Sequence, residues 1–165
     1  MSDGSRLDAP RAAAITVRPG HPGDRRFVLE ATRRLAAFGT PPGRTSEEIV
    51  EGEARTLRAF FDTASPPETL LIAEIEEDPC GFVFLEEKQD YFTGGLHGHI
   101  GILVVSAHAE GRGVGGALMA AAERWSRDRG YASLTLNVFD GNRRARGVYE
   151  HGGFRPDTVK YRKLL

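Results

Sequence analysis

The stretch Glu110-Gly111-Arg112-Gly113-Val114-Gly115-Gly116 decides how the rest of the sequence is interpreted. An apolar run at 97–105 precedes it and has the character of a strand, while apolar residues at helical spacing follow it over 114–129. Four glycines within six residues allow the backbone to turn sharply and to approach a ligand closely. The first amides of a helix have no partner within the helix and carry partial positive charge. This strand–turn–helix arrangement therefore predicts a site for a phosphate group.

The segments on either side of the turn predict an α+β fold. The expected strands are 14–18, 70–75, 81–87, 97–105 and 134–139, with a final hairpin in 154–165. The expected helices are 24–38 with Asp24 as N-cap, 45–61 with a Thr45–Glu48 capping box, 114–129 and 142–149. The helix between 97–105 and 134–139 makes these two strands parallel, whereas short turns make the earlier ones antiparallel. We therefore expect a mostly antiparallel twisted sheet with a central parallel pair and helices on both faces.

The length and composition fit one globular domain. The chain has 165 residues, and its 22 Lys and Arg residues nearly balance 23 Asp and Glu residues, so no global charge points to a nucleic acid. The single cysteine, Cys80, rules out an intrachain disulfide and a cysteine-based zinc site, and no metal is expected. No apolar run has membrane-spanning length, and the N-terminus lacks an apolar leader. We expect a flexible tail at 1–13 and a single cytoplasmic domain at 14–165 without a membrane partner; a homodimer stays possible.

Two classes of phosphate-binding protein compete for the glycine turn. Residues 111–116 match the G-x-G-x-x-G pattern of dinucleotide-binding proteins, and Asp140 follows the next strand, although late for a ribose contact. The dinucleotide-binding fold also needs a run of strand–helix–strand units, whereas hairpin strands precede this turn. A dinucleotide-binding oxidoreductase is therefore the less favoured alternative. A P-loop is excluded because no Lys-Ser or Lys-Thr pair follows the last glycine.

The stretch 100–154 resembles the GCN5-related N-acetyltransferase (GNAT) superfamily in two motifs. The first is an apolar strand end, Leu103-Val104-Val105, followed by the glycine turn at a helix start. The second resembles N-x-x-A-x-x-x-Y-x-x-x-G-F, with its members in register at Asn142, Ala145, Tyr149, Gly153 and Phe154. The order of elements extends the resemblance to about 14–165. It implies an acyl-CoA N-acyltransferase-like fold and the transfer of an acetyl group from acetyl-CoA to a primary amine of a small molecule or peptide.

The resemblance also implies which residues act on acetyl-CoA. Pantetheine would pair with the strand backbone at 103–105, where the N–H of Val105 or a neighbour would polarise the thioester carbonyl. Tyr149 would protonate the departing CoA thiolate, and Asn142 would either contact the cofactor or cap its helix. Three arginines would meet the CoA 3′-phosphate or form a solvated helix face: Arg143, Arg144 and Arg146. The expected cofactor-binding residues are Leu103, Val104, Val105, Gly111, Arg112, Gly113, Val114, Gly115, Gly116, Ala117, Asn142, Ala145 and Tyr149.

The general base is the least defined part of the expected site. Strict alternation along the strand places five residues on one face: His97, His99, Gly101, Leu103 and Val105. His99 is the candidate base, and it would act through a water relay because it lies roughly 20 Å from Val105 along a strand. Glu86 and Glu87, at the end of the neighbouring strand, are the alternatives.

The acceptor pocket is expected between the loop 39–44 and the loop 90–95, where Tyr91 and Phe92 would line it. Neither loop carries a charge pattern that names an acceptor. The first position of the glycine motif is Glu110, where the family usually has Gln or Arg. A carboxylate there would repel pyrophosphate, and Arg112 would offset it, so an acyl-CoA sensor without turnover is a further alternative.

Overall fold

The computed structural model describes residues 14–165, and these residues build one five-stranded sheet. In chain order the strands are β1 (Ile15–Pro19), β2 (Thr69–Ile75), β3 (Asp78–Gln89), β4 (Leu96–Val105) and β5 (Leu134–Leu136). Each strand pairs with the next, antiparallel from β1 to β4 and parallel between β4 and β5. The predicted mixed sheet is thus confirmed. The predicted tail at 1–13 lies outside the described residues.

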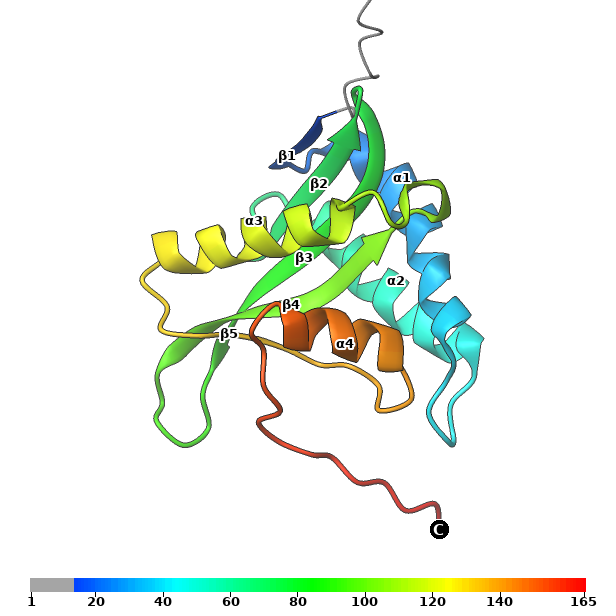
Figure 1. Ribbon diagram of the computed structural model, residues 1–165, viewed down its shortest axis with the longest axis vertical. Helices are drawn as coiled ribbons and strands as arrows, with labels where there is room; N and C mark the ends of the chain where they lie inside the picture. The colour runs from blue at the N-terminus through cyan, green and yellow to red at the C-terminus, as the bar shows by residue number, and fades with distance from the viewer. Residues whose placement is uncertain (1–13) are drawn as a thin grey trace, which may run out of the picture.

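Helices cover both faces of the sheet (Figure 1). On one face lie α1 (Arg25–Thr32) and α2 (Ser46–Asp62), and on the other lie α3 (Val114–Asp128) and α4 (Arg143–His151). Residues 14–165 also contain three short 3-10 helices: η1 (Pro22–Asp24), η2 (Arg33–Phe38) and η3 (Ala107–Ala109). The predicted capping box of α2 is present, since Thr45 Oγ1 accepts from the Glu48 amide at 3.1 Å and the Glu48 carboxylate accepts from the Thr45 amide at 2.7 Å.

Alternation along β3 supplies both hydrophobic cores. Phe82 and Phe84 are buried against α1 and α2, while Val83 and Leu85 are buried in the cluster that packs on α3. Each fully buried apolar side chain of this size contributes about 2 kcal/mol. Because β3 is buried on both faces, its sequence is a nearly continuous apolar run rather than an alternating one.

A bulge in β4 reverses the orientation of its side chains at Gly101. Phe84 of β3 lies opposite Ile102, but the next residue, Leu85, lies opposite Ile100, so Gly101 is an extra residue on β4. The packing shows the reversal, because Ile100 belongs to the core under α3 whereas Ile102 belongs to the core under α1 and α2.

The bulge corrects the prediction that five residues of β4 share one face. Before it, Gly98 faces α3, because a side chain there would run into Trp125 and Ser126. His97 and His99 alternate with Gly98, so they face the α1–α2 side, whereas Leu103 packs with the α3 core beyond the bulge. One extra residue shifts a period of two by one step, which is why strict alternation failed.

The parallel pair lies at the edge of the sheet rather than at its centre. β5 has three residues and pairs with β4 alone. The expected hairpin at 154–165 is not formed, and no strand is assigned in that segment. Its alternating apolar side chains Val159 and Tyr161 are 72 % and 91 % exposed, so no sheet surface is available to bury them. Pro156 also lacks the amide that a paired strand needs.

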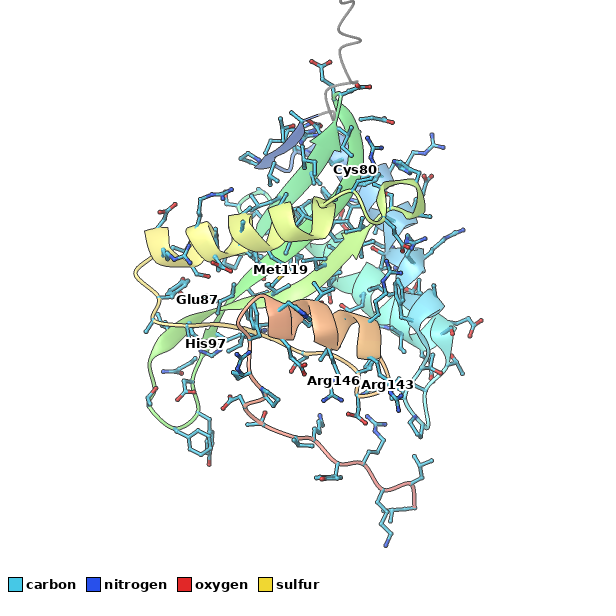
Figure 2. The ribbon with its side chains drawn as sticks, viewed as in Figure 1. Cys80, Glu87, His97, Met119, Arg143 and Arg146 are labelled. Carbon is cyan, nitrogen blue, oxygen red and sulfur yellow. The ribbon has the colours of Figure 1, made fainter. Side chains whose placement is uncertain are left out.

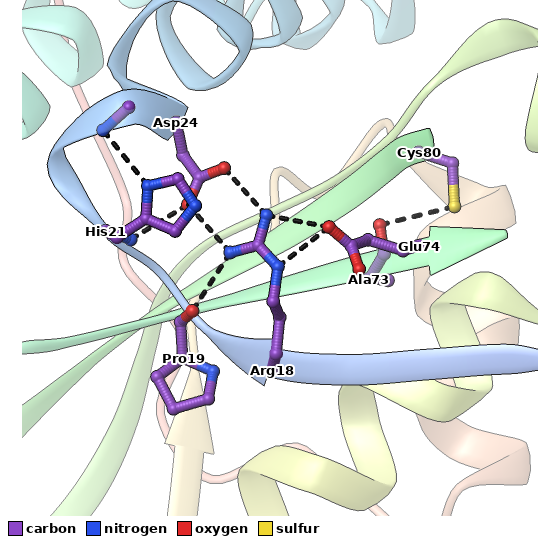
Figure 3. Close-up of polar contacts among 8 residues, drawn as sticks. Arg18, Pro19, His21, Asp24, Ala73, Glu74 and Cys80 are labelled. Carbon is purple, nitrogen blue, oxygen red and sulfur yellow. Dashed lines mark hydrogen bonds and ion pairs between the residues drawn. The ribbon is translucent and has the colours of Figure 1, made fainter. Parts of the chain in front are cut away.

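Arg18 joins the end of β1 to the start of α1 and to β2 (Figure 3). Its guanidinium donates to both carboxylate oxygens of Asp24, at 2.8 and 2.9 Å, and to Glu74 at 2.7 Å. Asp24 stands at the predicted N-cap of α1 but makes no cap bond, because its carboxylate is engaged by Arg18 and by the His21 amide. These bonds, Arg18 first, lower the pKa of Asp24 despite its burial.

Candidate active site

The glycine turn has the backbone geometry that the sequence predicts. Gly111 and Gly113 have φ values of 74° and 90°, in the left-handed region that only glycine adopts readily. Gly113 is the N-cap of α3, and the first helical bond runs from the Ala117 amide to the Gly113 carbonyl at 3.0 Å. Among the described residues, none accepts from the amides that precede Ala117 in the first turn: Val114, Gly115 and Gly116. These donors are therefore free for an anion.

Space for a ligand lies directly over this turn. A Cβ added at Gly111 or at Gly116 would meet no atom within 4 Å. A Cβ at Gly115 would lie 3.8 Å from Val105 Cγ2, so the turn sits beside the C-terminal end of β4. The glycine turn and the last residues of β4 thus adjoin each other.

The edge of β4 toward β5 is open over its C-terminal half. Pairing between the two strands ends at Ile100 and Leu136, after which the chain leaves the sheet. Within residues 14–165, the backbone of 101–105 has β3 as its one strand partner, so its other edge keeps free N–H and C=O groups. An extended ligand can pair with such an edge like an added strand. Leu103, Val104 and Val105 all lie on it.

Tyr149 of α4 packs on the α3 side of this open edge. Tyr149 packs against the buried cluster under α3, as do Leu103 and Val105, and its ring centroid lies 6.1 Å from that of Phe154. Burial raises the pKa of Tyr149 above its ordinary value, so the phenol keeps its proton at neutral pH and can donate it.

Asn142 acts as the N-cap of α4. Its Oδ1 accepts from the Ala145 amide at 3.1 Å. Of the three arginines that follow, Arg146 pairs with Asp140 at 2.6 Å, and Arg143 and Arg146 project from the side of α4 away from α3 (Figure 2). Arg144 alone bonds to the glycine turn.

Glu110 lies between two arginines from distant parts of the chain. Arg34 of η2 donates to its Oε1, and Arg144 of α4 donates to its Oε2 at 3.2 Å. The carboxylate that was expected to repel pyrophosphate is therefore compensated by two positive charges. Sequence reasoning missed both partners, which are brought to Glu110 only by the tertiary fold.

Beyond Ile100 and Leu136 the strands β4 and β5 no longer pair, and we call the space between them the gap; its closed end is where the pairing stops. His99 lies on the α2 side of the sheet, at this closed end. Its Nδ1 is 2.8 Å from Thr135 Oγ1 on β5. Burial lowers the pKa of His99 below its ordinary value, against a rise from Glu86 and with smaller lowering effects from Lys88 and His97. The imidazole is therefore neutral at pH 7 and able to accept a proton.

The two alternative bases lie on opposite faces of β3. Glu86 pairs directly with His99 across the strands, bonds to Lys88 Nζ at 2.9 Å and lies over Gly101. Glu87 faces the other side, where Tyr131 donates to it. Glu86 thus shares the surface of His99, and Glu87 does not.

The two loops expected to form the acceptor pocket lie far apart. The turn 90–95 is at the lower left of Figure 1 and the loop 39–44 is at the lower right. Tyr91 and Phe92 are 92 % and 83 % exposed and pack edge-on against each other. The β3–β4 hairpin is long enough to carry its tip away from the open edge of β4, so the two loops do not line one pocket.

Cys80 is buried near the N-terminal end of β3 (Figure 2). Its Sγ donates to the Ala73 carbonyl at 3.4 Å, and burial raises the pKa of the thiol, so it is a poor nucleophile.

Within the described part of the chain, no group of three or more His, Cys, Asp or Glu side chains is placed so that it could hold a metal ion. No helix in residues 14–165 combines the length and the apolar character that crossing a membrane requires.

Comparisons with known proteins give the family of this chain. A model of the acetyltransferase (GNAT) family matches residues 29–154. A mycothiol acetyltransferase of Stackebrandtia nassauensis is 34 % identical over 161 residues, covering 96 % of this chain and 51 % of the relative. One of Rhodococcus erythropolis is 29 % identical over 158 residues, covering 90 % and 51 %. The chain thus spans about half the length of these curated relatives.

The structural comparison supports the same assignment. A GCN5-related N-acetyltransferase from Ralstonia eutropha superposes with a TM-score of 0.72 at 19 % identity, covering 92 % of this chain and 99 % of that one. At this identity the likeness shows the fold alone. Together with the family match over most of the sequence, the fold and the uncapped glycine turn at the start of α3 show that the chain belongs to the acetyltransferase (GNAT) family.

Proposed function

We propose that this protein transfers an acetyl group from acetyl-CoA to a primary amine of a small molecule or peptide. The observation that carries the proposal is that the free edge of β4 ends beside the uncapped N-terminus of α3. Backbone amides there suit a pyrophosphate, and the edge suits a chain with amide groups, which pantetheine is. An NAD-dependent reaction is disfavoured because β4–α3–β5 is the sole parallel unit in residues 14–165.

The order of these features gives acetyl-CoA a direction. Pyrophosphate on the glycine turn lies beside Val105, so the pantetheine arm would run back along 101–105 toward the closed end of the gap. Five residues of strand span about 16 Å. The thioester would then lie near Gly101, and the polarising amide would belong to that end rather than to Val105. His99 is two residues from Gly101, or about 7 Å, within reach of one water relay.

The transfer needs one proton acceptor and one proton donor. The amine nitrogen attacks the thioester carbonyl carbon, a C–N bond forms and the C–S bond breaks. The proton lost by the nitrogen passes through water to His99, and Tyr149 gives its phenolic proton to the CoA sulfur. Exchange with solvent returns both side chains to their starting states. The products are an N-acetyl amine and CoA thiol.

The two groups would work from opposite sides of the sheet. Tyr149 packs with the α3 core, and His99 faces α2. Acetyl-CoA would therefore lie on the α3 side and the acceptor would enter from the α2 side, with the gap between β4 and β5 joining them. The relatives' name makes the acceptor of mycothiol acetyltransferases one candidate for an amine panel.

Calorimetric titration with acetyl-CoA, CoA and NAD tests the cofactor, and thiol release with an amine panel tests turnover. We expect micromolar binding of acetyl-CoA, no binding of NAD, and thiol release that depends on an amine. Binding of neither CoA form would refute the proposal, whereas binding without turnover on any amine would favour the sensor alternative.

The change Tyr149→Phe isolates the role of the phenol. It should lower kcat about 100-fold while the acetyl-CoA Kd changes less than about twofold, because the hydroxyl acts on the leaving group only. Tyr91→Phe removes a phenolic hydroxyl at an exposed hairpin tip and is the matched control. Equal losses of kcat and affinity in Tyr149→Phe would mean that the residue binds rather than donates.

A further inference from the structure

Three side chains form a row across the sheet at the closed end of the gap. Glu86 on β3 lies opposite His99 on β4, which lies opposite Thr135 on β5. Ile100 and Leu136, one step further, are the last pair before β5 ends. Thr135 therefore touches the candidate base at the point where the free edge of β4 begins.

The contacts of Thr135 restrict where its single hydroxyl proton can go. Its Oγ1 lies 2.8 Å from His99 Nδ1 and 3.4 Å from the Gly98 carbonyl oxygen. If the hydroxyl donates to Gly98, Oγ1 keeps a lone pair that accepts a proton from Nδ1, and both contacts are hydrogen bonds. If it donates to Nδ1 instead, the Gly98 contact joins two acceptors and the bond is lost. The first arrangement satisfies more groups.

The other imidazole nitrogen is open. Within residues 14–165, no group hydrogen-bonds to His99 Nε2, and Nε2 is not among the buried polar atoms without a partner, which are Arg34 Nε and Ser126 Oγ. Solvent or a ligand can therefore reach it. A neutral imidazole protonated at Nδ1 presents a lone pair at Nε2.

We propose that Thr135 is a positioning residue that holds His99 as the Nδ1–H tautomer, so that Nε2 receives the proton lost by the acceptor amine. This inference rests on the proposed function, because it assigns a partner to the base of that reaction. Thr135 itself exchanges no proton with the substrate. It fixes which nitrogen of His99 is basic.

The charged groups around His99 leave it neutral in this arrangement. Glu86 and Lys88 face it from β3, His97 lies on the same side of β4, and Glu53 of α2 faces Glu86. β5 contributes Thr135 and no charge at this register. Glu86 favours the imidazolium, while burial, Lys88 and His97 oppose it and prevail.

Long-range ¹H–¹⁵N spectra of the labelled full-length protein at pH 7.5 measure the tautomer directly, with His99→Gln identifying the signal. We expect the Nδ1–H pattern for His99, and a shift toward the Nε2–H pattern in Thr135→Val. A wild-type spectrum of the Nε2–H form would overturn the inference. This measurement needs neither acetyl-CoA nor an acceptor. Because the wild-type spectrum alone can overturn the inference, the test remains decisive even if Thr135→Val folds poorly.

Kinetics over pH 5.5–9 distinguish a role of Thr135 in positioning His99 from a purely structural role of Thr135. Thr135→Val should lower kcat about 10-fold and change the acid limb of the pH profile, with the acetyl-CoA Kd unchanged, and Thr135→Ser should restore both. Thr69→Val is the matched control, because it removes a hydroxyl that bonds the Trp125 ring nitrogen on the α3 side. An unchanged kcat and pH profile in Thr135→Val would overturn the inference.

The two proposals fail in different ways. Loss of acetyl-CoA binding or of all amine-dependent thiol release in the wild-type protein would refute the acetyltransferase proposal whatever the tautomer. An Nε2–H spectrum in a protein that binds and turns over acetyl-CoA would refute the role of Thr135 alone.

Discussion

Asp24 holds its negative charge with 4 % of its side chain exposed, because Arg18 and the His21 amide bond to it. The pKa of this carboxyl is lower in the folded protein than in the unfolded chain, where it is about 4. The ion pair therefore stabilises the fold above pH 4, and the stabilisation is lost as the pH falls through the folded-state pKa. Acid should therefore weaken the junction of β1, α1 and β2.

The change Asp24→Asn tests this at the level of one residue. It should lower the free energy of unfolding at pH 7 by about 2 kcal/mol, because Arg18 loses a charged partner in a half-buried position. The difference from the wild type should shrink below about pH 3. Urea unfolding at both pH values measures it, with Asp62→Asn, an exposed partner of Arg25, as the control that changes little. A difference independent of pH would mean that packing, not charge, is responsible.

Glu110 supplies the second prediction at this scale. Glu110→Gln removes one negative charge beside the glycine turn and releases Arg34 and Arg144 from it, so acetyl-CoA should bind about 3-fold more tightly at low salt. The gain should fade as the salt concentration rises. Calorimetry at two ionic strengths measures it, and Glu47→Gln on α2 serves as the control for a loss of charge elsewhere. Weaker binding would show that Glu110 is needed to hold Arg34 in place.

Residues near in sequence were predicted better than residues brought together by the fold. The Thr45–Glu48 capping box spans three positions, so its chemistry is legible in the sequence, and it is confirmed. Asp24 also carries a cap signal, but Arg18 takes its carboxylate. The partners of Glu110 come from η2 and α4, and no local pattern relates them.

At the scale of elements, the strand directions and most helix positions followed from period and turn chemistry, but the place of the parallel pair in the sheet and the face of each β4 residue did not. A bulge is a single added residue, and the presence of Gly101 in the sequence does not by itself indicate that a bulge forms there. Because of it, His99 faces α2 and Leu103 faces α3, which separates the candidate base from the α3 core. The expected last hairpin failed for another reason, since β5 is too short to receive it.

Gly116 lies in the first turn of α3, beside the amides that are free for an anion. Gly116 has an ordinary φ and open space around it, so Gly116→Ala should raise the free energy of unfolding by about 0.5 kcal/mol through helix propensity. The same methyl would stand where a pyrophosphate approaches the amides, so acetyl-CoA affinity should fall at least about 10-fold. Calorimetry and urea unfolding measure the two effects.

Gly52→Ala is the matched control for this change. Gly52 also lies in a helix with nothing within 4 Å of an added Cβ, but it is on α2, away from the glycine turn. It should raise stability by a similar amount and leave acetyl-CoA binding unchanged. If both variants bound acetyl-CoA as the wild type does, the ligand would not approach α3 at Gly116.

Residues 14–165 form one sheet between two cores, and the pairing of β4 with β5 ends at Ile100 and Leu136. The core under α3 carries Tyr149 at its margin, and the other face carries His99. This chain spans about half the length of the curated relatives, and its own glycine turn, open β4 edge and both candidate groups lie within the stretch that matches. A site divided between two faces works only when both faces are ordered together.

That requirement leads to a prediction for the molecule as a whole: both cores unfold in one transition. Ile72 and Ile75 lie on the same strand, β2, but Ile72 is buried under α1 and α2 and Ile75 under α3. The only tryptophan, Trp125, is in the α3 core, so its fluorescence reports that face, whereas far-UV circular dichroism reports all elements. Ile72→Val should lower the free energy of unfolding by about 1 kcal/mol and the Tm by roughly 2–4 °C.

Because β3 contributes alternate side chains to both cores, this loss should appear equally in fluorescence and in circular dichroism, although Trp125 is on the opposite face. Ile75→Val makes the same chemical change on the face of Trp125 and should also move both signals together. If Ile72→Val shifted the dichroism midpoint and left the fluorescence midpoint in place, the faces would unfold separately. Acetyl-CoA on the α3 side would then have no means of ordering the α2 side, where the acceptor is expected to bind.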